Sequence, residues 1–198
     1  MVKMKENIFL YAMIGFILFV CLRIYYSEKT DLKCIISSVD GNKYCVRDRV
    51  LLNESADLLA NVVAKCKEVV EYVKKKYPDD ADVLRLVKGF NPKKISETLP
   101  TSELTAYSEN KGEKIAFCLN KRKNGSELID LNTLTFVAIH ELAHIMTVSI
   151  GHKQEFWKNF KFLLTNATDA GIYRAVDYNK NKQPYCGMNI SDSPLYDM

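Results

Sequence analysis

The chain has 198 residues, of which 47% are hydrophobic and 26% are charged. This composition fits one globular domain plus an appendage rather than two domains, and no low-complexity segment or solenoid-like repeat is present. The formal net charge of +4 is modest and spread along the chain, and the basic clusters at 74–76 and 121–123 are typical of a helix end and a loop. The sequence therefore indicates no nucleic-acid partner.

The first predicted element is an uncharged apolar run from residue 8 to residue 22. A membrane span needs about 20 apolar residues, and the run reaches that length if Arg23 snorkels and Tyr25 and Tyr26 lie at the interface. We therefore expect a short tail over 1–7, a transmembrane anchor over 8–26 that contacts membrane lipid, and a single-pass membrane protein. Basic residues flank both ends of the run, so the orientation stays open.

Two alternatives bear on the compartment. A cleaved signal peptide competes with the anchor, since Lys3 and Lys5 precede the apolar run, but residues 23–28 lack the small-x-small pattern of a cleavage site. The cysteines outside the run allow either disulfide bonds or reduced thiols. Those that could pair are Cys34, Cys45, Cys118 and Cys186.

A linker over 27–33 is expected to lead into a domain over 34–198. Its first half predicts a hairpin that turns at Asp40-Gly41-Asn42, followed by a helix over about 55–77 whose apolar residues recur at helical spacing. Pro78 ends that helix and opens another that reaches Gly89. A loop over 91–104 and two strands, near 104–108 and 114–119, come next.

The second half predicts a helix that is capped by Asp130 or Asn132 and ends near residue 148. After a break at 149–151, a second helix carries Phe156 and Trp157, and the tail from Asp177 is expected to pack irregularly. The predicted fold is therefore α+β and helix-rich, with a small antiparallel sheet.

The segment HELAH, from His140 to His144, carries the strongest functional signal. Two histidines four residues apart on a helix project from one face, so both imidazoles can reach one ion at about 2.0–2.1 Å. Glu141 can then take a proton from a metal-bound water as that water attacks a carbonyl. The pattern predicts a zincin-like metal helix with Glu141 as general base.

His152 is the natural third ligand, because Gly151 permits a sharp turn that returns the chain to the metal. Three protein ligands leave the fourth position for water or substrate, which is typical of a catalytic zinc site. We therefore expect one Zn²⁺ per chain, held by His140, His144 and His152.

HELAH followed by GHKQEFW resembles the WLM and SprT-like zinc metallopeptidases, over roughly residues 131–164. The resemblance implies a metallopeptidase that acts on a protein or peptide, with zinc ligands at His140, His144 and His152 and the base at Glu141. The spacing between His144 and His152 fits neither subfamily fully. The layout of anchor and compact domain is also similar to metallopeptidase-like proteins of large DNA viruses.

Two further roles are predicted for the C-terminal region. A zincin usually supplies a side chain that stabilises the oxyanion, and the candidates here are Tyr173, Arg174, Tyr178 and Tyr185. Cys186 could act as a latch through a zinc-bound thiolate, although an ordinary free or disulfide-bonded cysteine is the simpler interpretation. The strand at 114–119 is expected to be the edge along which a peptide pairs.

The sequence thus predicts a membrane-anchored zinc metallopeptidase that hydrolyses peptide bonds. Two rivals stay open: a non-catalytic, zinc-stabilised structural protein of a membrane or virion, and a protease of DNA–protein crosslinks. The second rival lacks support from any DNA-binding segment in the sequence.

Overall fold

The structure is a computed structural model that describes residues 2–30 and 32–196. Residue 1 of the expected tail, residue 31 of the expected linker and residues 197–198 at the end of the expected domain lie outside the described residues. Side chains are described for residue 8, for 10–25 and from residue 32 onward to residue 196.

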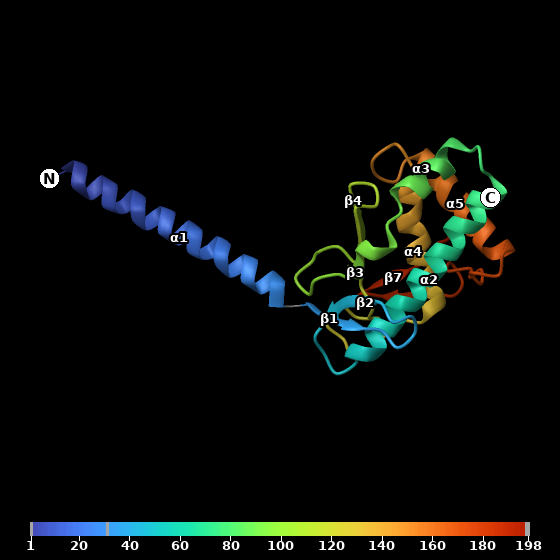
Figure 1. The fold of residues 1–198 in the computed structure, drawn as a ribbon, viewed down its shortest axis with the longest axis horizontal. Coiled ribbons are helices and arrows are strands. Elements are labelled where there is room, and N and C mark those ends of the chain that lie inside the picture. The colour runs from blue at the N-terminus through green and yellow to red at the C-terminus, as the bar shows by residue number, and fades with distance from the viewer. Residues whose placement is uncertain (1, 31, 197–198) are drawn as a thin grey trace.

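The N-terminal helix α1, Val2–Thr30, extends away from the rest of the molecule (Figure 1). No helix within the described residues is long and apolar enough to cross a membrane. This finding contradicts the transmembrane anchor expected over 8–26 and the single-pass membrane localisation.

Four helices pack together to form the body of the domain. The central one, α4, contacts the other three, and Figure 1 shows α2, α4 and α5 grouped on one side of the strands. Asp80 caps α3 by accepting hydrogen bonds from Asp82 N and Val83 N, and Asp130 caps α4 by accepting one from Thr133 N. The four helices are α2, Leu52–Lys76; α3, Ala81–Gly89; α4, Leu131–Met146; and α5, Gln154–Asp169.

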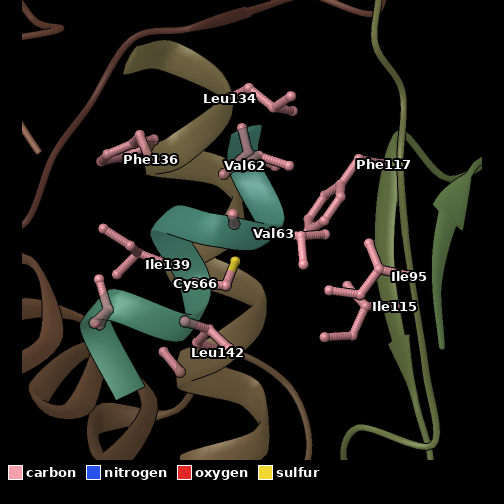
Figure 2. Close-up of a cluster of buried hydrophobic side chains, with 14 of the residues drawn as sticks. Val62, Val63, Cys66, Ile95, Ile115, Phe117, Leu134, Phe136, Ile139 and Leu142 are labelled. Atoms are coloured by element: carbon pink, nitrogen blue, oxygen red, sulfur yellow. The ribbon is translucent and has the colours of Figure 1, made fainter. Parts of the chain in front are cut away.

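The hydrophobic core lies between α2, α4 and the sheet (Figure 2). The apolar positions of α2 recur every three or four residues, so they form one stripe that the core buries. Cys66 belongs to this stripe, and its burial raises the pKa of its thiol to about 12, which keeps it protonated and apolar in character. Other core residues in this cluster are Val62, Val63, Ile95, Ile115, Phe117, Leu134, Ile139 and Leu142.

The main sheet has three strands in the order β3-β5-β4. β5, Lys114–Phe117, pairs antiparallel with β4, Ala106–Glu109, and parallel with β3, Ile95–Glu97. The sheet is therefore mixed rather than antiparallel, because the segment expected to be a loop contributes β3 after a short 3₁₀ turn, Pro92–Lys94. The strand at 114–119, expected at an edge, lies in the centre.

Two hairpins flank this body. The predicted N-terminal hairpin is confirmed as β1, Leu32–Ile36, and β2, Lys43–Arg47, and a disulfide joins its paired residues Cys34 and Cys45. The C-terminal tail, expected to be irregular, forms a second hairpin of β6, Gln183–Tyr185, and β7, Met188–Ile190.

A buried ion-pair cluster joins the N-terminal hairpin to the main sheet. The carboxylate of Glu97 accepts a hydrogen bond from Arg47 N at 2.7 Å and another from Arg49 Nη2 at 2.7 Å, and its side chain is fully buried. The Arg47 guanidinium lies 3.4 Å from the same carboxylate and donates to the carbonyl oxygens of Thr98, Leu99 and Lys123. Because each buried charge has partners, the cluster holds the two sheets together.

We expect Arg47→Met to lower the free energy of unfolding by about 3–5 kcal/mol, because Glu97 would lose one of its two buried cationic partners. Urea denaturation followed by circular dichroism measures this change. Lys33→Met is the matched control, because Lys33 pairs with Asp48 at the surface, where both side chains are more than half exposed, and such a pair contributes at most about 1 kcal/mol. Equal effects of the two substitutions would contradict the role given to Arg47.

Candidate metal centre

The C-terminal half of α4 presents the first two histidines of the site. His140 and His144 stand one turn apart, and their Nε2 atoms are 3.2 Å from each other. The helix is buried on most of its surface, so its packing against α2, α3 and α5 fixes the direction in which both rings point. The prediction that both imidazoles project from one face of a helix is confirmed.

The third histidine reaches the same point from the chain that follows α4. The helix ends at Met146, Gly151 adopts a left-handed φ of 78°, and α5 begins at Gln154. His152 Nε2 lies 3.0 Å from His140 Nε2 and 3.1 Å from His144 Nε2. The structure thus brings the three predicted ligands together, and they form a group that could hold a metal ion.

The spacing of the three nitrogens fits a tetrahedral ion. Bonds of about 2.0–2.1 Å at tetrahedral angles place ligand atoms about 3.3–3.4 Å apart. The separations of 3.0–3.2 Å between the Nε2 atoms differ from this value only by a few tenths of an ångström. Three nitrogen ligands leave one position of the tetrahedron for a water molecule or a substrate.

The electrostatic surroundings keep the buried ligand imidazoles neutral. The pKa of His140 is lowered to about 3 and that of His144 to about 4, mainly by burial and in part by neighbouring positive charge, including that of His152. A neutral imidazole offers a lone pair to a metal, whereas a protonated one does not. The rings are therefore ready to bind a cation at neutral pH.

Phe156 packs against all three imidazoles, a role that the sequence analysis missed. Its ring centroid lies 4.8 Å from that of His140, 4.4 Å from that of His144 and 4.6 Å from that of His152. The side chain is fully buried, so it forms a rigid apolar wall behind the ligands. The sequence signal for this role was the position of Phe156, four residues after His152 and in the first turn of the next helix.

Glu141 lies beside the ligands on α4 and is 4% exposed. Burial raises the pKa of its carboxyl to about 8. A cation held by the three histidines would attract the carboxylate and lower this pKa. A carboxyl group that titrates near neutrality can both accept and release a proton, as general acid–base chemistry requires.

The tyrosines predicted to stabilise an oxyanion are all buried. Tyr173 and Tyr178 pack against Phe136, one turn before His140, with ring centroids 6.1 Å and 4.7 Å from that of Phe136. Burial raises the pKa of the Tyr185 phenol and the charge of Glu141 adds to this shift, while the Tyr185 hydroxyl donates to the Thr105 carbonyl at 3.0 Å. The oxyanion role stays a prediction for each of them.

The fourth candidate, Arg174, is not brought to the histidines. Its backbone exchanges two hydrogen bonds with the side chain of Asn132, at the opposite end of α4 from His144. Eight residues of helix separate Asn132 from His140, which corresponds to about 12 Å. The guanidinium therefore belongs to a different part of the surface.

Cys186 forms a disulfide with Cys118, so its sulfur is not a thiolate that could bind a metal. The bond fixes the C-terminal hairpin to the chain just after β5, and Cys186 N and Gly187 N add hydrogen bonds to the carbonyls of Asn120 and Lys121. Cys186 therefore does not act as the predicted zinc-binding latch while this disulfide is formed. The disulfide instead fixes the C-terminal hairpin that contains Tyr185.

Residues 70–193 match the WLM domain family. The chain is 29% identical over 182 residues to the uncharacterized protein R325 of Acanthamoeba polyphaga mimivirus. The matched region covers 89% of this chain and 92% of that relative. It is 38% identical over 69 residues to the uncharacterized protein 136R of Invertebrate iridescent virus 6, covering 34% of this chain and 38% of that protein. No solved structure matches the chain.

The Cys118–Cys186 disulfide closes a segment with a sequence separation of 68, which contains α4 and α5. We expect its removal in a Cys118→Ala/Cys186→Ala variant to lower the free energy of unfolding by about 4 kcal/mol through the loop entropy of the unfolded chain. Removing Cys34–Cys45, with a separation of 11, should cost about 3 kcal/mol. Urea denaturation without reductant compares the two variants, and a smaller loss for the long loop would contradict this order.

We expect the three histidines to bind one metal ion per chain. His152→Ala should weaken binding by more than the about 10–100-fold that loss of an outer partner causes, because it removes a direct ligand. Competition with a colorimetric chelator measures the affinity, and Lys153→Ala, at the exposed neighbouring position, is the control. Full affinity in His152→Ala would show that the third histidine is not a ligand.

Proposed function

Because the chain belongs to the WLM family, we propose that it is a zinc metallopeptidase. The observation that carries this proposal is the convergence of three Nε2 atoms within 3.2 Å of one another, two of them from the helix that also carries buried Glu141. His140, His144 and His152 would hold the metal, and Glu141 would act on the reacting water.

Zinc is the metal that this donor set favours. Three neutral imidazoles with an open fourth position are the ligand set of catalytic zinc, whereas magnesium and calcium prefer oxygen ligands. When bound, zinc would polarise the peptide carbonyl and lower the pKa of a water molecule. One ion per chain follows from the single group of three ligands in the described residues.

Glu141 performs the proton transfers in this proposal. Its carboxylate accepts a proton from the attacking water, and the resulting carboxylic acid donates that proton to the nitrogen of the leaving amine. The buried surroundings of Glu141 strengthen its electrostatic interactions and exclude bulk water from the exchange. Among the predicted oxyanion donors, Tyr185 is the one whose phenol interacts electrostatically with Glu141, but its hydroxyl already donates to the Thr105 carbonyl.

The substrate in this proposal is an extended peptide segment. β4 is an edge strand of the main sheet and packs next to α4, so its outer side offers main-chain groups to a pairing peptide. This assignment replaces β5, which is central and has both neighbours filled. Pairing through main-chain atoms would align a peptide beside the helix that carries the ligands.

We expect Glu141→Gln to lower the rate of peptide hydrolysis by about 10²–10⁴-fold, because the amide cannot accept the proton of the attacking water. Zinc content should not change, since Glu141 is not a ligand. Cleavage of an unfolded protein substrate gives the rate, and elemental analysis gives the zinc content. Glu71→Gln, a charge loss at an exposed position of α2, is the control.

Undiminished cleavage by Glu141→Gln would overturn the proposed mechanism. A wild-type protein that binds zinc but cleaves no substrate would favour a structural role for the ion instead. Activity that rises with added DNA and falls with salt would indicate a crosslink protease.

A further inference from the structure

The chain between the second and third histidines, residues 147–151, is here called the ligand turn. It connects the end of α4 to the start of α5 and sets the position of His152 relative to His144. Charged side chains from two separate elements hold its main-chain atoms, and a third charged side chain holds the end of α4 just before it. This arrangement is not part of the HExxH motif.

Lys111 makes the most extensive of these contacts. Its Nζ donates hydrogen bonds to the carbonyl oxygens of His144 at 3.1 Å, Thr147 at 2.7 Å and Ser149 at 3.0 Å. The three N–H groups of an ammonium can satisfy three acceptors, so its donors are fully used. Carbonyls at the end of a helix lack intrahelical partners and carry partial negative charge, which a cation stabilises.

The backbone conformation of the hairpin between β4 and β5 directs the Lys111 side chain toward the ligand turn. Asn110, Lys111 and Gly112 have left-handed φ values of 45°, 57° and 105°. A lysine adopts this region only at a conformational cost, which the surrounding contacts must offset. Gly112 and Gly89 approach so closely that a Cβ on Gly112 would collide with the carbonyl oxygen of Gly89.

Glu155 holds the other side of the ligand turn. Its carboxylate accepts hydrogen bonds from Val148 N at 2.8 Å and Ser149 N at 3.1 Å. Because it lies in the first turn of α5, three residues after His152, it ties the turn to the helix that follows. Arg85 from α3 adds a hydrogen bond to the Met146 carbonyl at 2.5 Å.

We propose that Lys111 is a positioning residue for the metal centre: together with Glu155 it fixes the ligand turn, so that His152 stands ready at the site formed by His140 and His144. The inference rests on the proposed function, since it assumes that the three histidines bind zinc. Lys111 anchors the main chain of the ligand His144 itself and that of the turn which leads to His152. Neither contact depends on the side chains of the turn.

The consequence is energetic. A turn that is already ordered adds little conformational entropy to the cost of metal binding, whereas a loose turn must be ordered when His152 binds. Loss of Lys111 therefore lowers zinc affinity through the third ligand and leaves the His140–His144 pair on α4 intact.

The test compares zinc affinity in the full chain. Lys111→Met should raise the zinc Kd by about 10–100-fold in a chelator competition, the range that loss of an outer partner of a metal site causes. In the Co²⁺-substituted protein, the visible absorption of a four-coordinate site should weaken as His152 detaches. Lys114→Met is the matched control, because Lys114 lies on the same hairpin but over the ring of Tyr107.

The outcomes separate the two proposals. If the wild-type protein does not bind zinc, both the proposed function and this inference are contradicted. If the wild-type protein binds zinc and Lys111→Met has the same zinc Kd, this inference alone is contradicted. If Lys111→Met does not fold, Glu155→Gln decides, because it acts on the opposite side of the turn: we expect a Kd raised by about tenfold, and an unchanged Kd overturns the proposal.

Discussion

The chain reversal after α4 is the constraint on which the site depends. A helix can offer two ligands to one ion through residues four apart, but a third residue of the same helix cannot reach that ion in the same geometry. The third ligand must therefore come from chain that leaves the helix at once and turns back. Met146 ends α4 two residues after His144, and the chain returns so that His152 Nε2 lies 3.1 Å from His144 Nε2.

The rest of the domain keeps this reversal in place. The core between α2 and the sheet fixes α4, and Phe156 supports the three imidazoles from α5. A disulfide and main-chain hydrogen bonds fix the C-terminal hairpin to the chain just after β5.

Local signals in the sequence were sufficient to predict the helices and the convergence of the three histidines. The period of α2, the cap at Asp130 and the glycine before His152 each act within a few residues, and each prediction is confirmed. Strand order could not be predicted, because the parallel pairing of β3 with β5 depends on contacts between distant segments. The anchor expected from the apolar run at 8–26 is wrong, because no described helix is long and apolar enough to span a membrane. Lys111 was missed because its partners are backbone atoms more than thirty residues away.

Anchoring the turn by its backbone has an evolutionary consequence. Hydrogen bonds to carbonyl and amide groups do not depend on the side chain that the residue carries. Val148 and Ile150 are 62% and 85% exposed, so neither is required for packing. Mutation can therefore change the surface beside the histidines, and with it the sequences that the surface accepts, without moving a single ligand.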